Sequence, residues 1–141
     1  MISIKAGEGE ARQARAMTRS TTPFCIAVIE DDAPLLGALA FALEAEGWAT
    51  ATFTAPDEAL ARIGPADCLV VDYSLPQMDG LTLIARLRAQ GVTAPAILIT
   101  ARPDERCRRR ADAAGVPIVE KPLAPGQLQQ QIKAALGASG S

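Results

Sequence analysis

The chain has 141 residues, of which 49% are hydrophobic and 21% are charged, and its formal net charge is −2 at pH 7. This length and balance are typical of one folded domain and exclude a disordered chain, which combines low hydrophobicity with high net charge. Histidine is absent, so catalytic triads and zinc sites that depend on imidazole are excluded. The chain beyond residue 23 carries a net charge of −4, which disfavours general nucleic-acid binding because that binding depends on dense positive charge.

The ends of the chain differ from its middle. Residues 1–22 show little apolar periodicity, and we expect them to be a flexible arm or an extension ahead of the true start. The predicted domain spans residues 23–137, and residues 138–141 are expected to be a Gly/Ser tail. The apolar runs are far shorter than the roughly 18–20 residues of a membrane helix, and none resembles a signal-peptide core. We therefore expect a cytoplasmic protein with no membrane association.

From Phe24 onward, short apolar runs alternate with stretches of helical periodicity. The first run, 24–29, has the length of a strand and ends in an acidic stretch. A helix is expected over 34–47, with Asp32 as its capping residue, because its leucines recur at helical spacing and a glycine ends it. The same alternation predicts further elements, strand and helix in turn, at 48–53, 56–63, 68–72, 81–90, 95–100, 103–115, 117–120 and 125–136.

The order of these elements predicts the topology. Strands that are separated by single helices run parallel, because each connection crosses back over the sheet. The central strands are apolar at successive residues, which is typical of strands covered by helices on both faces. Right-handed crossovers favour a doubly wound five-stranded parallel α/β sheet in the order 2-1-3-4-5.

Polar residues with a common chemistry follow the strands at the edge where such sheets bind ligands. Glu30 and Asp31 follow the first strand, Asp72 ends the third, Thr100 ends the fourth and Lys121 follows the fifth. Three converging carboxylates suit a hard divalent cation such as Mg²⁺. The hydroxyl and the ammonium would bind phosphoryl oxygens, so the set is typical of phosphoryl transfer.

The motifs around these residues resemble the receiver domain of two-component response regulators, which has a flavodoxin-like (βα)5 fold. The resemblance covers residues 24–136 and rests on VIEDDAP at 28–34, VDYSLPQMDGL at 71–81, LITA at 98–101 and EKPL at 120–123. It implies that Asp72 accepts a phosphoryl group from a sensor histidine kinase or histidine phosphotransfer protein. It also implies that Thr100 and Lys121 complete the catalytic set and that Mg²⁺ is bound by Glu30, Asp31, Asp72 and the backbone carbonyl of Ser74.

Two further features bear on how such a domain would signal. Receivers usually carry an aromatic residue three positions before the lysine, and Ile118 stands there instead. The run Arg108–Arg110 is expected to be the solvated part of an amphipathic helix, and Asp79-Gly80 a turn that starts a helix outside the site.

The expected function is that of a stand-alone, chemotaxis-type receiver. It would act on an unidentified downstream protein, without direct nucleic-acid contact and without enzymatic activity beyond its own phosphorylation and dephosphorylation. One alternative is the receiver half of a longer transcription factor. Another is a Mg²⁺-dependent aspartyl-phosphate phosphohydrolase, which the serine at position 74 disfavours because such enzymes need a second carboxylate there. A third is a receiver that binds partners without being phosphorylated.

Overall fold

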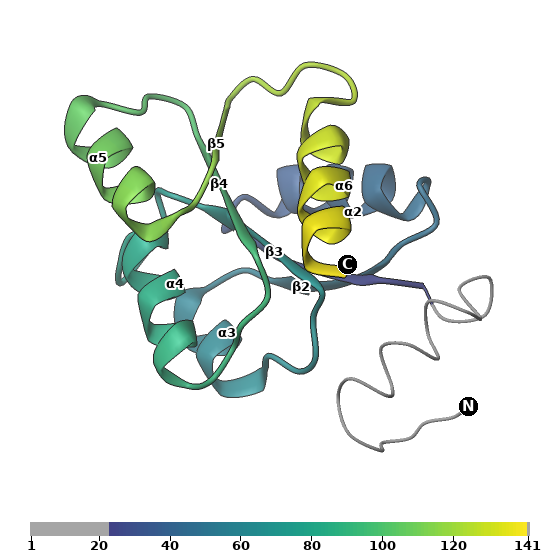
Figure 1. Ribbon diagram of the computed structural model, residues 1–141, viewed down its shortest axis with the longest axis horizontal. Coiled ribbons are helices and arrows are strands. Elements are labelled where there is room, and N and C mark those ends of the chain that lie inside the picture. Colours follow the sequence, from purple (N-terminus) through teal and green to yellow (C-terminus); the bar gives the residue numbers. More distant parts are fainter. Residues whose placement is uncertain (1–22, 141) are drawn as a thin grey trace.

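The computed structural model describes residues 23–140, with side chains as far as Gly137. Its sheet has the predicted topology (Figure 1). Five parallel strands lie in the order β2-β1-β3-β4-β5, so the predicted doubly wound α/β fold is confirmed. The strands are β1 (Cys25–Ile29), β2 (Ala49–Phe53), β3 (Cys68–Asp72), β4 (Ala96–Thr100) and β5 (Ile118–Glu120). The predicted arm, 1–22, lies outside the described residues and stays a prediction.

Five helices cover the two faces of this sheet (Figure 1). They are α2 (Ala33–Glu44), α3 (Pro56–Arg62), α4 (Gly80–Ala89), α5 (Glu105–Ala114) and α6 (Gln127–Gly140). Helices α3, α4 and α5 pack on one face, and α2 and α6 pack on the other. Within residues 23–140, every helix falls short of the length and apolarity needed to cross a membrane.

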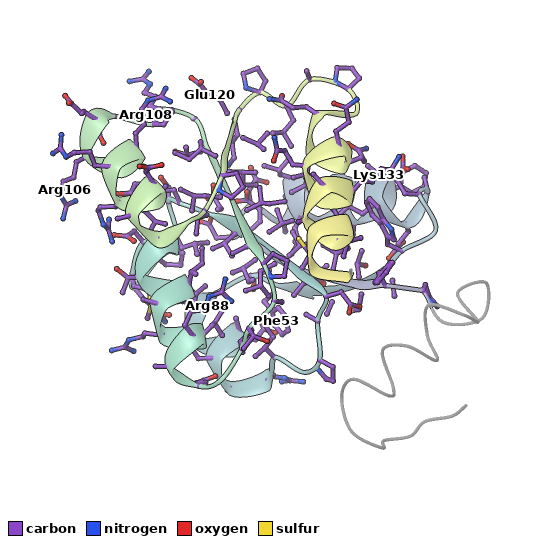
Figure 2. The ribbon with its side chains drawn as sticks, in the orientation of Figure 1. Phe53, Arg88, Arg106, Arg108, Glu120 and Lys133 are labelled. Atoms are coloured by element: carbon purple, nitrogen blue, oxygen red, sulfur yellow. The ribbon has the colours of Figure 1, made fainter. Side chains whose placement is uncertain are left out.

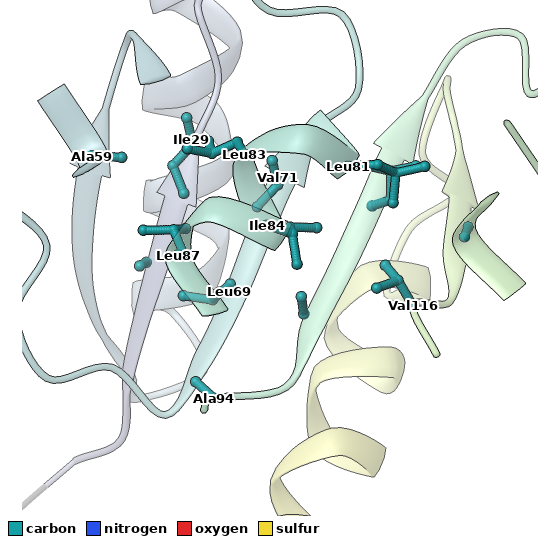
Figure 3. Packing of buried hydrophobic residues seen from close by; sticks show 14 of the residues in the cluster. Ile29, Ala59, Leu69, Val71, Leu81, Leu83, Ile84, Leu87, Ala94 and Val116 are labelled. Atoms are coloured by element: carbon teal, nitrogen blue, oxygen red, sulfur yellow. The ribbon is translucent and has the colours of Figure 1, made fainter. Parts of the chain in front are cut away.

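The core consists of two clusters that the sheet separates. Strands β1, β3 and β4 are buried almost throughout, because alternate side chains face the two helix layers. On one face, α4 packs its aliphatic side chains on β1 and β3 (Figure 3). On the other face, α2 and α6 enclose side chains of the same strands. Burial on both faces explains why the central strands are runs of apolar residues.

Capping side chains fix where the helices begin. The Asp32 carboxylate accepts from the Leu35 N–H at 3.1 Å, as predicted, and Asp79 accepts from the Thr82 N–H at 2.8 Å at the start of α4. Such a bond satisfies an N–H group that has no partner within the helix. Asp104 caps α5 in the same way through the Cys107 N–H at 2.8 Å, so α5 begins at Glu105, later than the predicted 103.

The last helix is longer than its sequence suggests. The sequence predicts a helix that ends at 136 and a Gly/Ser tail over 138–141, but α6 continues to Gly140. The part of α6 that packs on the core explains the extension. Adding residues to a formed helix costs little free energy, whereas starting a new helix is costly. Leu128, Ile132 and Leu136 anchor that part in the core.

Candidate functional site

The carboxyl edge of the sheet brings together the acidic residues that the strand ends predict. Glu30 follows β1 and Asp72 ends β3, and their side chains are 1% and 4% exposed. Asp31 is exposed beside them. One carboxylate oxygen from each of these three residues lies within 4.8 Å of the others. Two buried anions and one exposed anion therefore converge on one small volume.

Lys121, directly after β5, reaches across β4 to the centre of this cluster. Its Nζ lies 2.9 Å from Asp72 Oδ1 and donates to Glu30 Oε1 at 3.2 Å. The second oxygen of Glu30, Oε2, accepts from the Asp32 N–H at 3.1 Å. A single ammonium therefore serves two buried carboxylates, which leaves the cluster with an excess of negative charge.

Burial and charge act against each other in this cluster. Burial raises the pKa of Asp72 above the usual aspartate range, although Lys121 opposes the shift. Burial also raises the pKa of Glu30, and the nearby charge of Asp72 raises it further. The Asp32 N–H and Lys121 act in the opposite direction but do not cancel the shift. Burial alone would lower the pKa of Lys121, but Asp72 and then Glu30 outweigh it, so that this pKa is raised. A further cation would relieve the remaining repulsion between the carboxylates.

The donor set fits a hard divalent cation. All three side chains offer oxygen atoms, which is the chemistry that Mg²⁺ prefers. Asp72 Oδ1 is fully buried, and the Lys121 ammonium that lies 2.9 Å from it is shared with Glu30. Carboxylates that share one ammonium keep a net negative charge, which a divalent cation would offset.

The remaining predicted residues lie at the same edge. Asp72 is paired in register with Ile99, so Thr100 lies one residue further along the neighbouring strand. Thr100 is buried, and its carbonyl accepts from the Lys121 N–H at 2.9 Å. Ser74 is exposed in the loop after β3. Ser74 is therefore an exposed residue two positions after Asp72.

Gly80 is a site neighbour that the sequence analysis placed outside the site. The expectation that Asp79-Gly80 starts a helix is confirmed, but this start packs directly on the backbone of Asp72. A Cβ atom at position 80 would overlap the Asp72 carbonyl oxygen and would lie 3.0 Å from its carbonyl carbon. The Gly80 N–H also donates to the Tyr73 carbonyl at 2.8 Å. Helix α4 can approach Asp72 this closely only because position 80 has no side chain.

The prediction that Arg108–Arg110 is a solvated run is wrong for Arg110. Its guanidinium is half-buried and forms an ion pair with Asp79, with Nη1 3.0 Å from Oδ2. The three arginines point in different directions around the helix, and position 110 lies beside the buried Ala111. Arg108 and Arg109 are exposed to solvent, as predicted.

Comparison with protein families gives a match over most of the domain. The sequence model of the response regulator receiver domain matches residues 26–133. The chain is 39% identical over 116 residues to the phosphate regulon transcriptional regulatory protein PhoB of Rhizobium meliloti (strain 1021), a match that covers 79% of this chain and 51% of that protein. PhoB of Escherichia coli (strain K12) is 30% identical over the same shares. The chain thus spans about half the length of these curated relatives.

Solved structures show the same fold. A CheY-like receiver domain protein from Methanospirillum hungatei JF-1 is similar with a TM-score of 0.78 and 23% identity, over 84% of this chain and 97% of that one. The response regulator TrrA of Thermotoga maritima, in complex with Mg²⁺ and BeF, has a TM-score of 0.70 and 24% identity, over 80% of this chain and 99% of that one. The topology and the sequence match therefore agree.

Proposed function

The chain belongs to the receiver-domain family of two-component response regulators, and we propose that Asp72 is the residue in it that accepts a phosphoryl group. The observation that carries this proposal is the geometry around Asp72. Its carboxylate is buried at a strand end, 2.9 Å from Lys121 Nζ and grouped with two further carboxylates. Lone aspartates at strand ends often serve as turn or capping residues, and this arrangement goes well beyond that role.

The phosphoryl donor in this proposal is a phosphohistidine of a sensor histidine kinase or of a histidine phosphotransfer protein. A carboxylate oxygen of Asp72 attacks phosphorus in line while the bond from phosphorus to the donor's imidazole nitrogen breaks. The electron pair of that bond stays on the nitrogen, and an acyl phosphate forms on Asp72. The reaction needs mainly positioning and charge neutralisation, since the equatorial oxygens carry the negative charge.

Each neighbouring residue has a role in that reaction. Lys121 neutralises a phosphoryl oxygen, and its contacts with Asp72 and Glu30 hold its ammonium in place. The Thr100 hydroxyl donates a hydrogen bond to another phosphoryl oxygen. Thr100 is buried, so this bond draws the end of β4 toward Asp72 and shifts the segment that follows.

The metal of this proposal is Mg²⁺, held by Glu30, Asp31, Asp72 and the backbone carbonyl of Ser74. It would supply positive charge that offsets the repulsion between the carboxylates and the incoming phosphate. The compact oxygen cluster and the raised pKa values of Glu30 and Asp72 support this assignment.

The output of the domain is proposed to pass through protein contacts made by the segment after Thr100. Ile118, at the start of β5, is half-buried beside the α4 and α5 cluster and has no ring that could turn inward. A second candidate is the receiver half of a longer transcriptional regulator. It is favoured by the relatives that carry that description, of which this chain matches 51%.

Intact-protein mass spectrometry after incubation with acetyl phosphate and Mg²⁺ tests the proposal. We expect the gain of one phosphoryl group, which is lost with EDTA or in Asp72→Ala. Asp57→Ala is the matched control, since Asp57 is an exposed aspartate at the start of α3, and it should be phosphorylated like the wild type. An equal mass gain in Asp72→Ala, or no gain in a folded wild-type protein, would refute the assignment.

A further inference from the structure

Arg110 differs from the other arginines of α5 in its surroundings. Arg106 and Arg108 extend away from the helix into solvent (Figure 2). Arg109 pairs with Glu105 at 3.2 Å on the surface, where both side chains are more than half exposed. The Arg110 side chain, by contrast, is only 28% exposed. It turns toward α4 and the loop after β3, so its role is distinct from that of a solvated arginine.

The guanidinium of Arg110 connects three parts of that loop and helix. Nη1 and Nη2 donate to the two oxygens of Asp79 at 3.0 and 3.2 Å, a two-pronged ion pair. Nη1 also donates to the Tyr73 hydroxyl at 3.2 Å, and Nη2 donates to Thr82 Oγ1 at 3.3 Å. Paired hydrogen bonds between a guanidinium and a carboxylate are among the strongest in proteins and fix the relative orientation of both groups.

Asp79 remains charged in this pair at neutral pH. Burial alone would raise the pKa of Asp79, but hydrogen bonds from Arg110 and from the Thr82 N–H outweigh it, so that this pKa is lowered. The same carboxylate caps α4. Arg110 therefore holds the first residue before α4, and any movement of α5 pulls on the start of α4.

Helix α5 has few other attachments to the core. Of its ten residues only Cys107 and Ala111 are buried, and both side chains are small. Helix α4 has the same length and buries four large aliphatic side chains, as Figure 3 shows: Leu81, Leu83, Ile84 and Leu87. Since apolar stabilisation scales with the area buried, α5 gains much less from its core contacts. The ion pair of Arg110 is therefore a large part of what holds α5 in place.

This ion pair also links the two segments whose relative position phosphorylation would change. On one side, Tyr73 follows Asp72 directly, and α4 packs on the Asp72 carbonyl through Gly80. On the other side, residues 101–104 are all that separate Thr100 from α5. If Thr100 moves toward Asp72, α5 shifts relative to α4, and the contacts of Arg110 that fit the present arrangement must change.

We propose that Arg110 is a positioning residue whose contacts with Asp79 and Tyr73 hold α5 against the loop after β3 and thereby regulate the response of α5 to phosphorylation of Asp72. This inference rests on the proposed function of Asp72. The contacts oppose the movement of Thr100, so part of the interaction energy of the phosphoryl group is used to break them. Removal of Arg110 should release α5 and also strengthen binding at Asp72, because coupling between two sites is reciprocal.

Hydrogen exchange of the α5 amides measures the first of these effects. In Arg110→Ala we expect exchange in 105–114 to be about tenfold faster, the size expected when a hydrogen bond to a charged group is lost. Arg109→Ala is the matched control, an arginine of the same helix whose pair is on the surface. Asp79→Asn removes the charge of the ion pair but keeps a capping side chain, since asparagine caps helices equally well. It should therefore reproduce the effect of Arg110→Ala. Equal exchange in Arg110→Ala and Arg109→Ala would overturn the inference.

The affinity for beryllofluoride with Mg²⁺, measured by calorimetry, tests the second effect. Beryllofluoride mimics a phosphoryl group on a carboxylate, and we expect it to speed the exchange of the α5 amides in the wild type. Arg110→Ala should then bind beryllofluoride more tightly than the wild type, because the contacts that oppose binding are absent. If Arg110→Ala and Arg109→Ala bind beryllofluoride tightly and equally, the regulatory role of Arg110 is refuted, whereas the proposed function of Asp72 stands. If the wild type does not bind beryllofluoride, the proposed function of Asp72 is refuted and the regulatory role falls with it.

Discussion

The close contact between α4 and Asp72 makes Gly80→Ala a sensitive perturbation. The added Cβ atom would overlap the Asp72 carbonyl oxygen and would lie 3.0 Å from both the carbonyl carbon and Leu98 Cδ1. Two of these three atoms belong to the backbone of β3, which is paired on both sides and cannot shift alone. The start of α4 must therefore move away from the sheet.

The magnitude follows from two opposing contributions. Overpacking of this kind costs about 2–3 kcal/mol. Replacing glycine by alanine stabilises the fold by about 1 kcal/mol, because the unfolded chain loses conformational freedom. The free energy of unfolding should therefore fall by about 1–2 kcal/mol, which lowers Tm by about 5–10 °C in a domain of this size. Phosphorylation by acetyl phosphate should slow as well, since the backbone that carries Asp72 is displaced.

A matched substitution separates steric overlap from the general effect of losing a glycine. Gly37 lies inside α2, and a Cβ atom there meets nothing within 4 Å. Gly37→Ala should therefore raise the free energy of unfolding by about 0.5–1 kcal/mol. Thermal unfolding followed by circular dichroism measures both variants under the same conditions. A Tm for Gly80→Ala equal to or above that of the wild type would refute the packing argument.

Three further outcomes follow from the charges of the site. Asp72→Asn should raise the free energy of unfolding at pH 7, because it removes a buried charge. Burial raises the pKa of Asp72, so the wild type loses stability as pH rises through that pKa and the buried carboxyl becomes charged. Urea denaturation should therefore show a smaller difference between Asp72→Asn and the wild type at acidic pH. Lys121→Met should lower the same free energy by about 2–4 kcal/mol at pH 7, since Asp72 and Glu30 lose their shared cation; a loss that persists unchanged in acid would contradict this. Mg²⁺ at about 100 times its dissociation constant should stabilise the wild type by about 2.7 kcal/mol, and Asp31→Asn should need more Mg²⁺ for the same rise in Tm; identical titrations would argue against the metal site.

The topology and the carboxylate cluster could be predicted because each depends on a general rule. Parallel strands end at a common edge, so Glu30 and Asp72 were expected to meet even though their positions in the sequence are far apart. The reach of Lys121 across β4 follows from the same rule together with the length of its side chain. Helix starts were also readable, since Asp32 and Asp79 occur where capping aspartates are preferred.

The role of Arg110 could not be predicted in the same way, because its partner Asp79 caps another helix, α4, and no rule fixes how α5 packs beside α4. A partial signal was present. Arg110 follows Cys107 by three residues and precedes Ala111, so helical geometry places it at the border of the apolar face rather than opposite to it. The close approach of Gly80 to Asp72 had no sequence signal beyond the glycine itself, since glycine is also common in turns.

The division of the core into two clusters has a consequence for the order in which the chain can fold. The cluster under α3 and α4 draws mainly on segments that follow one another along the chain, so its contacts close short loops. The cluster under α2 and α6 joins the first described helix to the last, and it requires a long loop to close. Long-range contacts form late because the entropy of closure must be overcome before they stabilise the chain. During synthesis, the part of this sheet face that α6 covers therefore stays exposed until α6 has left the ribosome, whereas the opposite face can already be packed.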